Sequence, residues 1–406
     1  MTSTTTIATR EEADRLPVAG LLALAMTGFL CIVTETLPAG LLPQISDGLA
    51  VSSSLAGQTV TAYAMGSVLA AIPLTLATSG WRRRTVLLLA IFGFLIFNSV
   101  TAISTAYWLT LAARFFAGVS AGLAWSLLAG YARRMVALSQ QGKAVAIAMV
   151  GTPIALSLGV PLGTWLGTSV GWRWAFGIMS LLTLILIAWV LAKVPDYAGQ
   201  AKGDRSPLPQ VFKTPGVRPV LCVVIAWMLA HNLLYTYIAP FVAVANLADH
   251  VDLVLLVFGV AALVGIWVAG KFVDRALRRT VLLSLLAFGL TSLVLAVWAV
   301  VPSVLLVAVA TWGVTFGGAA TLLQTALADA AADGADVALS MNVVAWNAAI
   351  ACGGLLGGVL LEAWGVSAFP WAMALLLAIG FLIAWRARTH GFPAGHRLSP
   401  GPALGH

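Results

Sequence analysis

The sequence predicts an all-α integral membrane protein whose twelve transmembrane helices form two homologous six-helix bundles. Of the 406 residues, 61% are hydrophobic and only 9% are charged, whereas a soluble domain carries roughly 25% charged residues. The apolar residues form runs long enough for helical spans of about 20 residues. Short motifs also recur in the two halves of the chain at one constant offset. This composition excludes a soluble enzyme, a disordered chain and a disulfide scaffold.

Six apolar runs in the first half are interpreted as spans. Each is predicted to be a helix, because lipid cannot satisfy free backbone groups. The runs are long and continuous, unlike the short alternating segments of a β-barrel. The spans cover residues 17–42, 54–78, 85–104, 107–131, 144–167 and 172–193.

The second half contains six further runs, at residues 217–244, 253–273, 280–300, 303–328, 339–362 and 368–386. The halves are separated by a stretch rich in proline and glycine with mixed charges, which is typical of a linker. The predicted organisation is a cytoplasmic N-tail (1–16), a first bundle (17–193), a cytoplasmic linker (194–216), a second bundle (217–388) and a disordered cytoplasmic tail (389–406).

The basic residues predict that both termini are cytoplasmic, in a multi-pass protein of the cell (inner) membrane. All but two of the 22 Lys and Arg residues fall in the tails, the linker and the loops that this orientation places inside. The exceptions are Arg114, inside a span, and Arg173, at the start of one. The net charge of +8 therefore reflects membrane topology, and we expect no nucleic-acid partner.

An internal repeat relates the two halves. The sequence Arg-Arg-Thr-Val-Leu-Leu occupies residues 83–88 and again 278–283, an offset of 195 (278 − 83). The same offset pairs Gly118, Gly122, Gly159 and Gly163 with Gly313, Gly317, Gly354 and Gly358. Parallel repeats of this kind predict a substrate site at the interface between the halves, near the membrane midplane.

Two charged residues inside spans, Glu35 and Arg114, are candidates for proton coupling, because intramembrane charges are functional by default. Both lie roughly 10 Å from the outer side of the membrane. An acid and a base at one depth can pair, and protonation of the acid would release the pair. Two alternatives stay open: a static salt bridge that fixes helix register, or a position of Glu35 above the membrane, in a mouth shaped by Pro38 and Pro43.

Polar and aromatic residues in three spans are candidates for lining a substrate cavity. Trp125 lies on the same helix face as Arg114, and His231 and Tyr235 share a face of span 7. The alternatives are packing and interhelical hydrogen bonds, and His231 could instead titrate. The full set is Trp125, His231, Asn232, Tyr235, Asn342, Trp346 and Asn347.

Glycines, prolines and one charged loop are candidates for gating and helix packing. Glycines four apart let helices approach closely, and the prolines of span 5 bend it, as a pliable gate or as a packing kink. The charged loop between spans 8 and 9 could hold one state closed, or serve only as a topology determinant. These residues are Gly118, Gly122, Gly151, Pro153, Gly159, Pro161, Gly163, Gly270, Asp274, Arg275, Arg278 and Arg279.

These features resemble the major facilitator superfamily over residues 17–388. Glycine and basic residues around Asp274 look like its loop signature, whereas the first copy, at residues 78–84, keeps the basic cluster without an aspartate. The Arg114-Gly118-Gly122 run resembles the span-4 signature of the 12-span drug:proton antiporter branch. Its span-5 signature is similar to residues 151–163, in a variant form. The stretches 34–45 and 342–358 resemble the subgroup of sugar, arabinose, purine-nucleoside and chloramphenicol exporters.

The resemblance implies proton-coupled efflux, and it carries a proton-linked role onto Arg114 and Glu35. We therefore predict a secondary active transporter, not an enzyme. It would export a small uncharged or weakly polar compound (drug, sugar or nucleoside-like) in exchange for protons, by alternating access. The alternative is a proton-independent facilitator or an importer of a sugar-like solute.

The sequence has no nucleotide-binding loop, no HExxH or CxxC pattern and no arguable Ser-His-Asp set. The driving force must then be an ion gradient or the substrate's own gradient, and we expect the proton gradient. We expect no cofactor or metal, and a monomer in the lipid bilayer. A membrane enzyme would need more convergent acids, histidines or metal ligands at one depth. A sensor would need a soluble output domain, which a partner would have to supply.

Overall fold

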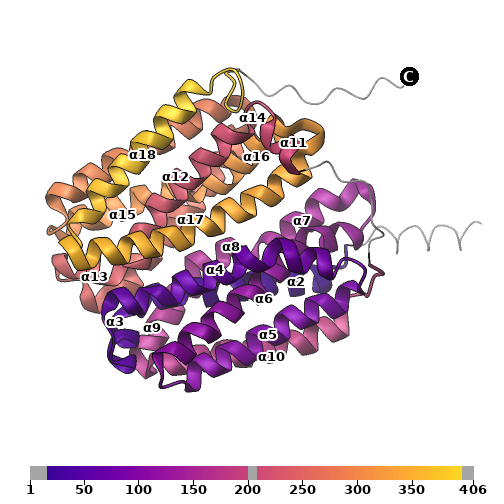
Figure 1. The fold of residues 1–406 in the computed structure, drawn as a ribbon, viewed down its shortest axis with the longest axis horizontal. Helices are drawn as coiled ribbons and strands as arrows, with labels where there is room; N and C mark the ends of the chain where they lie inside the picture. The colour runs from indigo at the N-terminus through magenta and orange to yellow at the C-terminus, as the bar shows by residue number, and fades with distance from the viewer. Residues whose placement is uncertain (1–15, 200–207, 396–406) are drawn as a thin grey trace, which may run out of the picture. The chain divides into compact units, whose positions relative to one another are not determined.

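The computed structural model describes residues 16–199 and 208–395 and, in these ranges, consists of helices and connections without strands. The predicted tails at 1–15 and 396–406, and linker residues 200–207, lie outside the described residues. Contacts within the chain divide it into two compact units, Met1–Gly203 (unit 1) and Asp204–His406 (unit 2). The indigo-to-magenta and red-to-yellow halves of Figure 1 are these two units.

Eleven helical segments in the described ranges are long and apolar enough to cross a membrane. One of them, Ala248–Trp298, has 51 residues, or about 75 Å of helix, against a hydrocarbon core of about 30 Å. It contains α14 (Val251–Trp298), whose backbone leaves the helical region at Ala276. This kink separates predicted spans 8 and 9, so the segment holds two spans. The all-helical, twelve-span fold class is confirmed.

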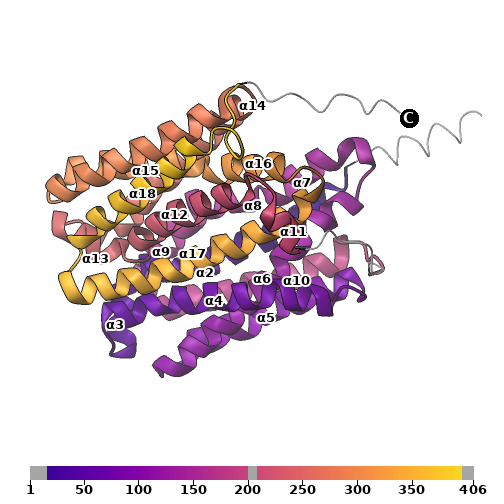
Figure 2. The same cartoon turned by 45° about the horizontal axis from the view of Figure 1, so that its top comes forward.

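In unit 1, helix α2 (Val18–Gly40) is the central element. It packs against α4 (Ser53–Ala77), α6 (Tyr107–Arg134), α10 (Trp172–Lys193) and the pieces of span 5, while α5 (Arg83–Ile103) packs on α6 and α10. Its sequence explains this place, because small and apolar residues occur on all sides of it and leave no polar stripe. The short helix α3 (Leu42–Leu49), which we did not predict, follows α2 (Figure 2).

Span 5 is broken into α7 (Gln141–Met149), α8 (Gly151–Ile154), a π-helical turn (Ala155–Gly159) and α9 (Val160–Val170). The π turn lies between Pro153 and Pro161, the two residues expected to bend the span. Proline lacks the N–H that would continue the α-helical bonding, which accounts for a wider turn at this point.

In unit 2, α12 (Val217–Thr236) takes the central place and continues as α13 (Ile238–Val242). It packs against α16 (Ala319–Ala331), α17 (Ala335–Trp364) and α18 (Ala368–Arg386). The remaining span begins with α15 (Pro302–Gly317), which breaks at Gly318 and continues as α16.

The repeat at offset 195 is also a repeat of packing. A Cβ atom on Gly118 would meet the main-chain oxygen of Tyr63, and one on Gly313 would lie 2.5 Å from the main-chain oxygen of Phe258. Tyr63 and Phe258 are themselves 195 residues apart. Each unit therefore uses the same glycine position to bring the same pair of helices together.

Candidate functional site

Arg114 is completely buried in unit 1, and its guanidinium is held by backbone atoms of two neighbouring helices. Nε donates to the carbonyl of Thr59 on α4, and Nη2 donates to the carbonyl of Glu35 on α2, both at 3.3 Å. The rings of Tyr63 and Phe176 lie 4.9 and 5.4 Å from the guanidinium carbon. Nη1 is buried and has no hydrogen-bond partner.

Glu35 lies beside Arg114 at the same level, as the sequence predicted, and it is 6% exposed. It is a buried residue of α2, a helix long and apolar enough to cross a membrane. The carboxylate nevertheless makes no ion pair with Arg114, and its Oε1 atom is buried without a hydrogen-bond partner. The static salt bridge is therefore not the arrangement in this structure. A buried acid with an unsatisfied oxygen is costly, which is typical of a group that changes partner or charge.

Further polar contacts continue from α2 towards α5. Thr34, the neighbour of Glu35, accepts a hydrogen bond from the side-chain nitrogen of Asn98 at 3.2 Å, and both residues are completely buried. The Asn98 side-chain oxygen has no partner. Because Pro38 has no N–H, the Thr34 carbonyl also lacks its usual helical donor. These contacts were not predicted, since single Thr and Asn residues in an apolar run carry no sequence signal.

The second unit has no charged pair at the positions that correspond to Glu35 and Arg114. An offset of 195 residues leads to Ala230 and Val309, and both are completely buried. The repeat therefore preserves the helix packing but not the charges. Among the described residues, the buried acid–base arrangement belongs to unit 1.

Unit 2 instead contains an aromatic cluster around His231. The imidazole stacks on Phe316 with ring centroids 3.6 Å apart, and Nδ1 accepts a hydrogen bond from Trp312 Nε1 at 3.1 Å. An indole N–H can only donate, so Nδ1 must be unprotonated and the neutral ring carries its hydrogen on Nε2. Tyr235 and Phe258 complete the cluster, with ring centroids 5.1 and 5.7 Å from that of His231.

The structure brings together only part of the predicted cavity set. Trp346 extends the cluster, with its ring centroid 6.5 Å from that of Phe316. Trp125 is not part of this cluster: it is a half-buried residue of unit 1, beside Gly28. The side-chain nitrogens of Asn232 and Asn347 donate to carbonyls of their own helices. The side-chain oxygen of Asn342 is buried and unpartnered. Trp312, Phe316 and Phe258 were missed, because aromatic residues in apolar runs cannot be distinguished from packing by sequence alone.

The predicted packing glycines of span 5 lie against α2. A Cβ atom on Gly151 would meet Ala25, one on Gly159 would meet Phe29 and Val33, and one on Gly163 would meet Leu37. These α2 residues follow one another at intervals of four. The π turn interrupts this glycine face. The glycines thus bring span 5 close to the helix that carries Glu35.

In the charged loop of unit 2, Arg278 is bound to the end of the last helix. Arg278 donates to the carbonyls of Ala384 and Trp385, near the end of α18, and to that of Phe392. Arg275 and Arg279 are exposed, and Gly270 has open space around it. The residues at 391 and 392 are buried, so the predicted disordered tail does not begin at 389.

In unit 1 the aspartate that is absent from the first loop is supplied by the linker. Asp196 Oδ2 pairs with Arg82 Nε at 2.5 Å, and Oδ1 accepts from the Arg84 main-chain N–H at 3.1 Å. These bonds hold the pKa of Asp196 below its usual value. The Tyr131 hydroxyl donates to the Pro195 carbonyl at 2.6 Å. Linker residues 194–199 are therefore bound to one end of unit 1 and are not a free connection.

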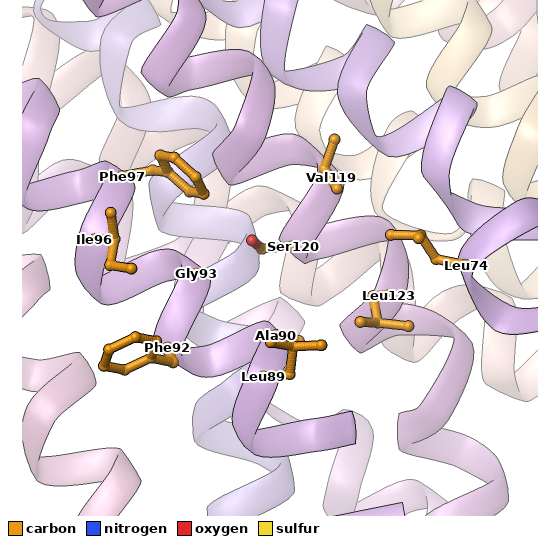
Figure 3. Close-up of a pocket in the computed structure, with 10 residues that line it drawn as sticks. All are labelled: Leu74, Leu89, Ala90, Phe92, Gly93, Ile96, Phe97, Val119, Ser120 and Leu123. Carbon is orange, nitrogen blue, oxygen red and sulfur yellow. The ribbon is translucent and has the colours of Figure 1, made fainter. Parts of the chain in front are cut away.

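A cavity of about 240 Å³ lies between α4, α5 and α6. Figure 3 shows that Ser120 is the polar side chain among leucine, isoleucine, valine and phenylalanine. Its hydroxyl already donates to the Phe116 carbonyl at 3.0 Å. Leu89, Phe92 and Ile96, which line the cavity, are also exposed on the surface. The cavity is therefore apolar, and its lining has no free polar group that could orient a polar solute.

Comparison with known proteins agrees with this fold. The model of the Major Facilitator Superfamily matches residues 24–335 and, in a second match, residues 248–403. The chain belongs to this superfamily and is a multi-pass membrane transporter of it. The crystal structure of a D-xylose-proton symporter is similar in fold, with a TM-score of 0.78 and 16% identity over 93% of this chain and 99% of that one.

Relatives with more similar sequences include two named exporters. The chain is 26% identical to a probable sugar efflux transporter of Pasteurella multocida, over 96% of this chain and 97% of the relative. It is 29% identical to the purine ribonucleoside efflux pump NepI of Salmonella enteritidis, over 88% and 91%. It is also 29% identical to a protein named transcription regulatory protein OpdE in Pseudomonas aeruginosa, over 93% and 95%. The predicted likeness to the efflux subgroup is confirmed.

Proposed function

We propose that the protein exports a small uncharged or weakly polar compound, of the drug, sugar or nucleoside type, in exchange for protons. It acts by alternating access in the cell (inner) membrane, as a monomer with both termini in the cytoplasm. The basic loops and tails support this orientation. The export direction is supported by the names of the sugar and purine ribonucleoside relatives.

The observation that carries the proton-coupling proposal is the unpaired state of Glu35. Its Oε1 atom and the Arg114 Nη1 atom are both buried without partners, although the two residues are joined through the Glu35 carbonyl. In the proposed cycle a proton from outside neutralises the Glu35 carboxylate. Loss of that proton to the cytoplasm returns a carboxylate that accepts a hydrogen bond from Nη1. The change of partner at α2 is coupled to the change of conformation.

The aromatic cluster in unit 2 is proposed to contribute to substrate binding. Aromatic rings and one imidazole N–H suit a neutral ring compound that offers a hydrogen-bond acceptor. The buried positions in unit 2 that correspond to the charged pair are apolar, which favours an uncharged substrate over an ion.

The test uses proteoliposomes with a pH-sensitive dye inside and a pH gradient across the membrane. Arabinose, chloramphenicol and a purine nucleoside are added in turn to wild type, Glu35→Gln and Glu362→Gln. Glu362 is an exposed glutamate on α17 and serves as the matched control. Substrate-driven proton movement in wild type and Glu362→Gln, but not in Glu35→Gln, supports the proposal.

The direction of the proton movement separates exchange from co-transport. Protons that move with the substrate would contradict antiport and favour an importer. Substrate counterflow without proton movement in any variant would establish a facilitator. Proton movement that survives Glu35→Gln would assign the proton to another group.

A further inference from the structure

We infer that Tyr63 is a positioning residue that keeps the Arg114 guanidinium on the backbone of α2 and away from the Glu35 carboxylate. It thereby sets the pH range in which protons are exchanged. This inference rests on the proposed function, and it adds to it a residue on α4 that neither the sequence motifs nor the charges indicated.

Tyr63 is connected to both partners of the site. Its ring lies 4.9 Å from the guanidinium carbon of Arg114, and its hydroxyl donates to the carbonyl of Cys31 at 2.9 Å. Cys31 lies one helical turn before Glu35, whose carbonyl accepts from Arg114. Tyr63 and Arg114 therefore bind successive carbonyls on one face of α2.

The backbone of Tyr63 has little freedom to move. Its main-chain oxygen is so close to Gly118 that a Cβ atom there would overlap with it, and Gly118 is one turn after Arg114. The side chain is 1% exposed. The ring is thus fixed at both ends, by α6 at the backbone and by α2 at the hydroxyl. A fixed ring can hold a guanidinium more effectively than a mobile one.

The energetic argument concerns a competition for the guanidinium. A desolvated cation–π contact with Tyr63 stabilises the guanidinium where it lies, and the two carbonyl bonds add to this stabilisation. The competing arrangement is an ion pair between Nη1 and the Glu35 carboxylate, which a low dielectric strengthens. Without the ring, the guanidinium is freer to turn towards the carboxylate. That would stabilise the deprotonated acid, so proton uptake would need a more acidic medium.

Few other groups could produce the same effect. Within the part of the chain that the structure describes, the titratable side chains around Glu35 at membrane depth are Arg114, Tyr63 and, on α2 itself, the completely buried Cys31. The remaining charged residues on elements packed against α2 lie at or near the ends of those elements. They are Asp47, Arg133, Arg134, Lys143, Arg173 and Lys193.

The test compares Tyr63→Leu, which removes the ring, with Tyr63→Phe, which keeps the ring and removes only the bond to Cys31. The control is Phe369→Leu, which removes a completely buried ring from unit 2. The pH profile of proton-coupled flux is recorded with the probe that drives proton movement in wild type. We expect Tyr63→Leu to shift the profile by about one pH unit to lower pH, since one unit corresponds to about 1.4 kcal/mol. Tyr63→Phe, whose ring is no longer bound to α2, should shift the profile in the same direction but by less than Tyr63→Leu does, and the control should keep the wild-type profile.

A second measurement needs no substrate. The infrared carbonyl band of the protonated Glu35 carboxyl, assigned by its loss in Glu35→Gln, is followed against pH in purified protein. Tyr63→Met, which preserves most of the side-chain volume, replaces Tyr63→Leu if that variant does not fold. A ring-free variant with the wild-type band titration and flux profile would overturn the inference. A wild-type protein that moves no protons and shows no titrating band would instead overturn the proposed function.

Discussion

Arg114 Nη2 donates a hydrogen bond to the main-chain carbonyl of Glu35 at 3.3 Å, whereas the Glu35 carboxylate makes no ion pair with Arg114 and its Oε1 atom has no partner. The base is thus attached to the residue that carries the acid without neutralising it. In this arrangement carbonyls and aromatic rings, and not the acid, hold the completely buried guanidinium. The proton can then change the charge of Glu35 while the contact between α2 and α6 persists.

Arg114→Lys is expected to reduce proton-coupled flux by about tenfold or more. A lysine ammonium cannot span the carbonyls of Thr59 and Glu35 in the geometry of a guanidinium, and a lost buried partner costs about 1–3 kcal/mol. The measurement is dye-reported proton movement in proteoliposomes, with the amount of folded protein matched. Arg173→Lys is the control, because Arg173 also binds carbonyls, those of Ser104 and Gly48, but is only half-buried. Equal flux in both variants would show that transport does not require the bonds from Arg114 to the carbonyls of Thr59 and Glu35.

Gly118→Ala and Gly313→Ala are expected to destabilise the protein by about 1–3 kcal/mol each, because the new methyl group overlaps with a facing main-chain oxygen. Gly177→Ala is the control, since nothing lies within 4 Å of a Cβ atom there. In a helix, such an open glycine gains about 0.5–1 kcal/mol on replacement by alanine. Thermal unfolding in detergent measures all three. A Gly118→Ala protein as stable as Gly177→Ala would contradict the close approach of α4 and α6.

Much of this architecture could be predicted from the sequence, for a physical reason. A span must be a long apolar helix, so all twelve could be located by length and hydropathy. Spans 8 and 9 form the single long helix α14, and a kink at Ala276 separates them. Buried charges are rare in membranes, which made Glu35 and Arg114 stand out. Their common depth followed from helix geometry alone.

The partners of these charges could not be predicted. Arg114 binds main-chain carbonyls, and every residue of a helix offers one, so no sequence pattern marks Thr59 as a partner. Tyr63 and Asp196 became relevant only through contacts between segments far apart in the chain. One signal was available: Tyr63 and Phe258 are aromatic residues separated by the repeat offset of 195.

Asp196→Asn is expected to lower stability near neutral pH by less than about 1 kcal/mol, because its partner Arg82 is 69% exposed and solvent screens the pair. The pKa of Asp196 is lowered in the folded protein. Its contribution is therefore fully present above the unfolded-state pKa and is lost as the pH falls through the lower, folded-state value. Melting temperatures of wild type and Asp196→Asn should converge at acidic pH. A difference in melting temperature that stays constant at all pH values would show that the charge of Asp196 does not contribute to stability. Asp249→Asn, at an exposed aspartate, is the control for general charge effects.

Trp312→Phe is expected to weaken substrate binding while leaving the number of protons moved per substrate unchanged. In the wild type the indole N–H occupies His231 Nδ1, so the imidazole is neutral and presents Nε2–H as a donor. Phenylalanine preserves the aromatic packing but removes that bond, whose net value is about 0.5–1.5 kcal/mol. The ring can then adopt the other tautomer, and the apparent KM for the transported probe should rise about fivefold, in line with that energy. Trp298→Phe, at an exposed tryptophan, should leave the apparent KM unchanged. If Trp312→Phe instead altered the proton-to-substrate ratio at constant KM, His231 would be part of the proton path, and Glu35 would not carry the proton alone.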